Sequence, residues 1–133
     1  LGIGFGLSLV AESSSVGVYY SADVVVPPGG GEVPEEIGKK AAYQLLETIS
    51  QGGCVSRVAA SNVLILMAMG SEDVGRLRIG RDIIASEEMV GLARDLKTFG
   101  ASSWGLRDAE DESGDIVVSV KGTGVGNVGR KIA

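Results

Sequence analysis

The sequence predicts an α+β fold in which helices pack on one face of a mixed β-sheet. Three observations support this prediction: β-rich runs near both ends, apolar residues at helical spacing in the middle, and glycine or proline clusters between them. The expected order is two strands, two helices, a strand, a helix and two strands, which is typical of two packed layers. At 133 residues and 44% hydrophobic content, the chain can build one core.

The first two strands are expected to form a hairpin. Apolar residues alternate over residues 7–11, and a second run rich in valine and tyrosine follows over 18–26. The serines at 13–15 between these runs indicate a turn. The Pro-Pro-Gly-Gly-Gly stretch at 27–31 suits neither a strand nor a helix, so we expect an exposed loop there.

A long helix is predicted over residues 34–50. Proline is tolerated in the first helical turn, two glutamates follow at the positive end of the helix dipole, and Gly52-Gly53 ends the pattern. One face is apolar at helical spacing, so we expect it to be buried against the sheet. This face carries Ile37, Ala41, Leu45, Leu46 and Ile49.

The remaining elements follow from composition and alternation. Residues 57–69 favour a helix that is apolar on all sides and therefore buried on most of them. Residues 76–79 alternate as a short strand with two arginines on one face. Ser86 is the predicted cap of a third helix that ends near Gly100. Two last strands are expected at 103–107 and 116–121, across an acidic turn at 110–114.

Net charge, cysteine content and apolar run length limit which classes of function and location the sequence fits. The net charge of −5 argues against non-specific nucleic-acid binding over the whole surface. Residues 76–107 nevertheless hold six basic and four acidic side chains, so phosphate contact is expected there. The single cysteine excludes a disulfide within the chain and fits a reducing compartment. The longest apolar run, residues 63–69, is far below the ~20 residues needed to span a bilayer, so we expect no membrane partner.

Five segments, in this order and spacing, resemble the RNA 3′-terminal phosphate cyclase family. They are Gly-Phe-Gly-Leu-Ser-Leu-Val-Ala-Glu at 4–12, the helix at 34–50, Gly-Ser-Glu-Asp at 70–73, Arg-Asp-Leu-Lys at 94–97 and Gly-Val-Gly-Asn at 124–127. The resemblance implies repeated units of two helices and four strands, with a smaller inserted domain. Residues 1–133 are then expected to be the C-terminal part of a cyclase-like domain, its last repeat plus the junction before it, in a longer chain.

The enzymes of this family carry a nucleophilic histidine just before the third helix. This chain has Ile-Ile-Ala-Ser-Glu at 83–87 in that region and no histidine anywhere. The enzymes also place an acidic residue and a glutamine in contact with nucleotide, where this chain has Ser61 and Asn62. Without an imidazole, no side chain here can form the phosphoramidate. The resemblance is therefore to the non-catalytic eukaryotic branch, with no cofactor expected.

That branch implies an assembly factor for the small ribosomal subunit. It would act in pre-rRNA processing in the nucleus and nucleolus, with a ribosome-assembly GTPase, pre-ribosomal RNA and other small-subunit processome components as partners. Two alternatives remain open. One is an RNA endonuclease at a pre-rRNA processing site, in which Arg94, Asp95 and Lys97 hold a phosphate and polarise a 2′-hydroxyl. The other is an active RNA 3′-terminal phosphate cyclase with its nucleophile outside this chain.

The candidate contacts to RNA or a partner are mostly basic. Two arginines on one strand face can meet two phosphates, although charge also protects an edge strand from aggregation. A lysine near a helix C-terminus also suits the helix dipole. The candidates are Arg94, Asp95, Lys97, Arg76, Arg78, Arg81, Arg130 and Lys131. The glycine-rich segment 122–126 is similar to a phosphate-binding loop but is read as a turn after the last strand. No metal site is predicted.

Overall fold

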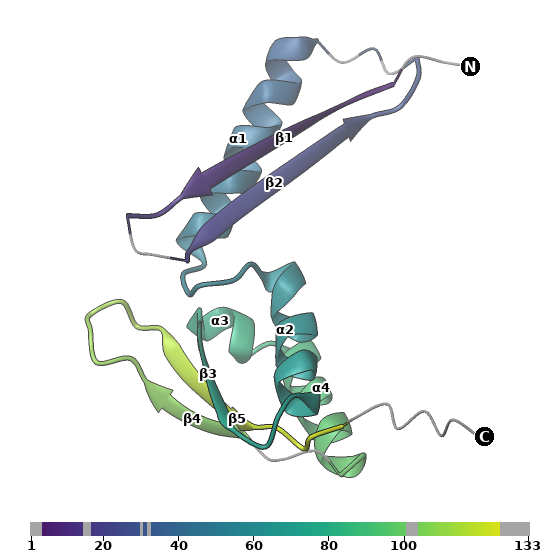
Figure 1. Cartoon of the computed structure of the whole chain (residues 1–133). Helices are drawn as coiled ribbons and strands as arrows, with labels where there is room; N and C mark the ends of the chain where they lie inside the picture. Colours follow the sequence, from purple (N-terminus) through teal and green to yellow (C-terminus); the bar gives the residue numbers. More distant parts are fainter. Residues whose placement is uncertain (1–3, 15–16, 30, 32, 101–103, 126–133) are drawn as a thin grey trace, which may run out of the picture.

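The computed structural model describes residues 4–14, 17–29, 31, 33–100 and 104–125. The chain forms two units, one stacked on the other (Figure 1). The first unit contains β1 (Phe5–Glu12), β2 (Tyr19–Val26) and α1 (Pro34–Ser50). The second contains α2 (Arg57–Met69), β3 (Val74–Ile79), α3 (Arg81–Ile84), α4 (Glu87–Thr98), β4 (Trp104–Asp108) and β5 (Ile116–Lys121). The predicted α+β class is confirmed.

In the first unit, α1 packs on one face of the β1–β2 hairpin. The strands are antiparallel, with Phe5 opposite Val26 and Glu12 opposite Tyr19. The core between hairpin and helix is formed by Val24, Val26, Ile37 and Ala41, with Leu7 and Leu9 packed against it. Farther along α1, Leu46 is 60% exposed and Ile49 is 39% exposed. The apolar face predicted for this helix is therefore buried only over its first turns, where the hairpin valines lie.

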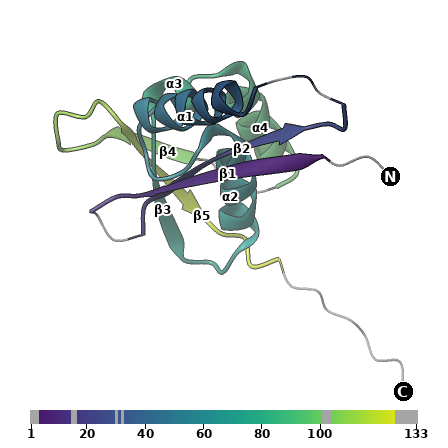
Figure 2. The ribbon, with the colours of Figure 1, turned by 90° about the horizontal axis from the view of Figure 1, so that it is seen from above.

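In the second unit, α2 and α4 lie on the same side of a three-stranded sheet (Figure 1). The strand order is β3-β5-β4, and β5 is antiparallel to both neighbours. One face of β5 carries Ile116, Val118 and Val120, which are buried in a single core with Leu64 of α2 and Met89 of α4. Seen from above, the β1–β2 hairpin extends across this unit (Figure 2).

Three sequence-based expectations differ from the structure. The described strands form two antiparallel sheets rather than one mixed sheet, because β1 and β2 pair with each other while β3, β4 and β5 form a separate sheet. The four-residue helix α3 was not predicted, since it is too short to show a helical period. Helix α2 is less buried than its composition indicates, with Val58 86% and Leu66 68% exposed. Among the described helices, none is long and apolar enough to cross a membrane.

The predicted helix stop Gly52-Gly53 is the linker between the two units. Gly52 and Gly53 have positive φ angles of +73° and +79°. Residues with a side chain rarely adopt this backbone conformation. A Cβ atom on Gly53 would also lie 2.7 Å from the backbone nitrogen of Gly80. The linker crosses the end of β3 at this point, where the Cys54 N–H donates to the Arg78 carbonyl at 2.9 Å. Glycine is therefore required here by both conformation and space.

Candidate functional site

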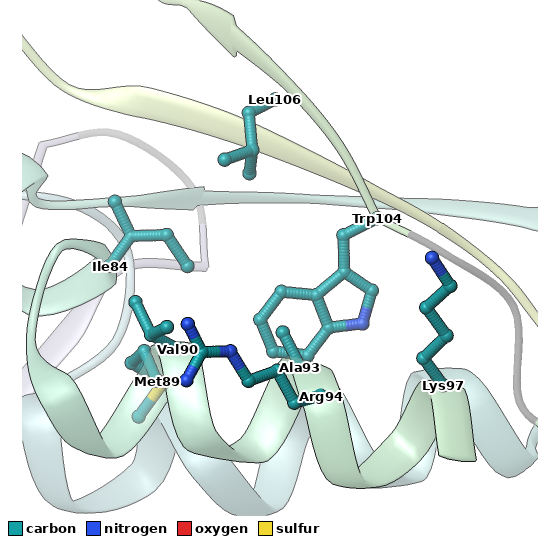
Figure 3. Close-up of a pocket in the computed structure, with 8 residues that line it drawn as sticks. All are labelled: Ile84, Met89, Val90, Ala93, Arg94, Lys97, Trp104 and Leu106. Carbon is teal, nitrogen blue, oxygen red and sulfur yellow. The ribbon is translucent and has the colours of Figure 1, made fainter. Parts of the chain in front are cut away.

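A cavity of about 300 Å³ lies between α4 and β4 (Figure 3). Helix α4 begins at the predicted cap, because the Ser86 hydroxyl accepts a hydrogen bond from the Met89 N–H. One face of α4 then points its side chains toward β4. Alternate residues of β4 point their side chains toward α4. The lining residues are Ile84, Met89, Val90, Ala93, Arg94, Lys97, Trp104 and Leu106. We call this the α4–β4 pocket.

The α4–β4 pocket combines an apolar floor with one buried donor and two cations. Figure 3 shows the Trp104 ring between the side chains of α4, with Lys97 beside it. The Trp104 indole nitrogen is buried and has no acceptor within the described structure. Leaving such a donor unpaired costs about 1–3 kcal/mol, so this N–H lowers the stability of the described structure. The arrangement suits an apolar group that carries an acceptor or a negative charge.

The structure brings together two of the three residues considered for RNA cleavage. Arg94 and Lys97 are three positions apart, share one face of α4 and line the pocket. Asp95 is exposed and is not among the lining residues. Adjacent helical residues point in directions about 100° apart, so Asp95 projects away from its neighbour's face. The three side chains therefore do not converge on one point.

The other group of basic candidates consists of Arg76, Arg78 and Arg81, and two of these arginines form ion pairs. Arg76 and Arg78 share one face of β3, as predicted, because Arg76 lies opposite Ser119 and Arg78 opposite Val117 of β5. The Arg78 guanidinium pairs with Asp115 at 2.6 Å and with Asp111 at 2.7 Å. Its hydrogen bond to Asp115 is the largest factor that raises the pKa of Arg78. Arg78 therefore has a structural partner already.

Arg81 also has partners. Its guanidinium forms an ion pair with Asp108, and its Nε donates to the Gly114 carbonyl at 3.1 Å. These contacts tie the start of α3 to the turn between β4 and β5. The last two candidates, Arg130 and Lys131, lie outside the described residues. The six candidates that the structure describes thus do not form a single site.

The glycine-rich segment after β5 is not arranged to bind phosphate. In its described part, residues 122–125, the Thr123 N–H donates to the Ala68 carbonyl at 2.9 Å and the Gly124 N–H donates to the Gly70 carbonyl at 2.7 Å, both at the end of α2. These bonds satisfy carbonyls that a helix end leaves without partners. The segment is therefore a cap for α2. Among the described residues, no group of three or more histidine, cysteine or acidic side chains is placed to hold a metal ion.

Sequence reasoning did not find the apolar part of the α4–β4 pocket. Trp104 and Leu106 are two positions apart on β4, and both lie opposite buried residues of β5, Val120 and Val118. Alternation along this predicted strand could have indicated that Trp104 and Leu106 share one face, because it places both side chains on the side that faces the helices. The buried indole N–H could be recognised only from the packed structure.

Comparison with known proteins supports the family resemblance. The family model for the RNA 3′-terminal phosphate cyclase (RTC) insert domain matches residues 1–50. The rRNA processing protein RCL1 of Saccharomyces cerevisiae is 37% identical over 131 residues, which cover 98% of this chain and 35% of that protein. The human RNA 3′-terminal phosphate cyclase-like protein is 40% identical over 99 residues, which cover 72% of this chain and 26% of that protein.

The chain belongs to the RNA 3′-terminal phosphate cyclase-like family. It spans about a third of the length of the yeast relative and about a quarter of the human one. The insert-domain match ends at Ser50, where α1 ends, so it coincides with the first structural unit. In this cyclase-like chain the pocket and the basic residues of β3 therefore belong to the second unit. That residues 1–133 form the last repeat plus a junction stays a prediction.

Proposed function

We propose that this cyclase-like chain is part of a protein that acts in rRNA processing, as an assembly factor for the small ribosomal subunit. The observation that carries the proposal is the likeness to two rRNA processing proteins along nearly the whole chain. The relative from Saccharomyces cerevisiae aligns with 98% of it, and the one from Schizosaccharomyces pombe aligns with 97% at 37% identity. The alignments cross the boundary between the two units, so both units are part of the likeness.

The proposed role does not use cyclase chemistry. Nucleotidyl transfer through histidine needs an imidazole, and these 133 residues contain none. The segment where the family's enzymes carry that histidine holds Ile83, which is only 2% exposed, and the helix cap Ser86. These residues serve packing and helix initiation. We propose that the segment keeps the fold of the enzymes and has lost their reaction.

The α4–β4 pocket supports docking rather than cleavage. Tryptophan and arginine are enriched among residues that dominate binding energy at protein interfaces, and Trp104 and Arg94 lie together here. A general acid–base mechanism would instead need Asp95 within hydrogen-bond reach of the same bound group. We therefore propose that the pocket contacts a protein partner, a ribosome-assembly GTPase, in the nucleolus during assembly of the small-subunit processome.

Affinity purification of the full-length protein from its own cells tests this role. Proteins that co-purify are identified by mass spectrometry, and RNAs by sequencing. One large GTPase together with small-subunit precursor rRNA is the expected recovery. Components of RNA repair or splicing ligation in their place would contradict it. Incubation with labelled ATP tests the cyclase alternative, for which a covalent adenylate is required.

Matched variants separate docking from cleavage. The double variant R94A/K97A should lose the GTPase, whereas D95A should keep it, because Asp95 lies outside the pocket. If the endonuclease alternative holds, all three residues are needed for cleavage at a pre-rRNA site while the GTPase still co-purifies with each variant. Northern blots of precursor rRNA from the same cells read the cleavage.

A further inference from the structure

The three-stranded sheet has a second face that the helices leave open. Side chains alternate across a strand, so the residues between the buried positions of β5 point away from α2 and α4. Both helices lie on the other side of the sheet (Figure 1). The register of the three strands places eight residues on the open face: Val74, Arg76, Arg78, Gly105, Arg107, Val117, Ser119 and Lys121.

The open face is basic although the chain is acidic. Four of its eight strand positions carry arginine or lysine, and no strand position on it carries aspartate or glutamate. The acidic side chains that pair with its arginines come from the segment between β4 and β5, at one end of the face. There Asp111 and Asp115 pair with Arg78, and Glu110 lies 3.7 Å from Arg107. The local charge can therefore attract an anion despite the net charge of −5.

Two arginines on this face, Arg76 and Arg107, are available to bind a ligand. Arg76 is exposed and makes no hydrogen bond or ion pair within the described structure. The side chains of Arg107 and Glu110 are 57% and 90% exposed, so their long ion pair contributes little to stability and a ligand can replace it.

Small residues lie between the arginines at the centre of the open face. Arg76, Ser119 and Gly105 lie in one row across the strands, and Arg78, Val117 and Arg107 lie in the next row. The rows are about 6.7 Å apart, the rise of two residues along a strand. Gly105 and Ser119 let an extended chain come close to the sheet between the arginines. None of the eight residues of this face is aromatic, so a base finds no ring here on which to stack.

We propose that this open sheet face binds the sugar–phosphate backbone of single-stranded RNA, without regard to base sequence. Arg76 and Arg107 contact successive phosphates, and the Ser119 hydroxyl lies between them as a further donor. The inference rests on the proposed function in rRNA processing and adds where the RNA lies. It also assigns opposite faces of the second unit to different ligands, with protein at the α4–β4 pocket and RNA at the sheet.

Fluorescence anisotropy of a labelled oligouridine with the full-length protein tests this proposal over a range of salt concentrations. Each phosphate contact to single-stranded RNA contributes about 0.7 to the slope of log affinity against log salt. The variant R76A/R107A should therefore bind about tenfold more weakly at low salt and lose about 1.4 from that slope. The control K39A/K40A removes the same charge from exposed positions of α1 and should match wild type.

Two controls show whether a loss of RNA binding comes from lost charge or from unfolding. Circular dichroism shows whether R76A/R107A is folded, and R76K/R107K, which keeps both charges, should restore most of the affinity. Equal affinity and slope for wild type and R76A/R107A would overturn the proposal. So would a preference of more than about tenfold for one base sequence, because backbone contacts carry no sequence information. Loss of a co-purifying acidic protein without loss of RNA binding would assign the face to protein instead.

Failure of this proposal can be told apart from failure of the proposed function. The role in rRNA processing is read from co-purifying GTPase and precursor RNA, and it stands if those are recovered while R76A/R107A binds oligouridine like wild type. In that case the RNA is held by another surface of the protein.

Discussion

Asp115 and Arg78 are joined at the point where the two units of the chain meet. Arg78 Nε donates to Asp115 Oδ2 at 2.6 Å, and the same oxygen accepts a hydrogen bond from the Gly53 N–H at 3.2 Å. The Gly53 carbonyl in turn accepts from the Tyr20 hydroxyl of β2 at 2.6 Å. One carboxylate thus connects the three-stranded sheet to the linker, and the linker connects to the hairpin. This set of contacts fixes how the first unit is attached to the second.

Replacing Asp115 with asparagine should destabilise the protein by about 1–3 kcal/mol. Asp115 is 6% exposed, so its loss leaves the Arg78 guanidinium and the Gly53 N–H with a poorer acceptor. Asp108→Asn is the matched control, because it breaks an ion pair with Arg81 whose carboxylate is 76% exposed and should cost less than about 1 kcal/mol. Urea unfolding measures both. Equal costs would show that the linker does not depend on Asp115.

Gly53→Ala should cost more than the same change at Gly29. Both glycines have φ of +79°, so both variants carry the backbone penalty of about 1–2 kcal/mol. Only Gly53 lies against another backbone, since a Cβ there meets Gly80 at 2.7 Å, while nothing lies within 4 Å at Gly29. The difference between their unfolding free energies isolates the close crossing of the linker and β3. No difference would mean that the crossing is loose.

Tyr20 should make stability fall at alkaline pH. Burial, followed by the nearby Cys54 and Asp115, raises the pKa of Tyr20 above 10.0. A raised pKa favours the folded state while the phenol is protonated, so this contribution is complete below pH 10.0 and is lost as the pH rises through the folded-state pKa. Unfolding free energies of wild type and Tyr20→Phe, measured from about pH 8 to 11, should therefore converge toward high pH. Parallel curves would contradict the assignment.

Trp104→Phe should change stability by less than about 1 kcal/mol and still weaken partner binding. Phenylalanine keeps an aromatic ring in the α4–β4 pocket and removes a buried N–H that has no acceptor among the described residues. Thermal unfolding and co-purification of the proposed GTPase partner measure the two effects separately. A stability loss above about 2 kcal/mol with unchanged co-purification would indicate that the indole N–H serves the fold rather than a ligand.

Most helices and strands could be predicted from sequence because their signals are local. The helix over Pro34–Ser50 has its proline start and glycine stop within the same stretch, and the cap at Ser86 is followed by an amphipathic segment. The strand Ile116–Lys121 alternates so regularly that its buried face follows from the sequence alone.

The site was less predictable because it depends on which elements meet. The face shared by Arg76 and Arg78 follows from strand alternation, but their different pairing depends on Asp111 and Asp115 from a distant turn. The pocket around Trp104 exists only because β4 returns beside α4. Charge and position near the end of a predicted helix indicated Arg94, Asp95 and Lys97 as candidates, and the helix geometry then separated Asp95 from the other two.

The central claim, a role in rRNA processing, is tested most directly with a chimera. The segment of the Saccharomyces cerevisiae rRNA processing protein RCL1 that aligns with this chain is replaced by these 133 residues, and precursor rRNA is measured after the cell's own protein is depleted. We predict that the chimera restores processing of small-subunit precursors and that the same chimera with R94A/K97A does not. A folded, stably expressed chimera that leaves precursor rRNA unprocessed would contradict the proposed function.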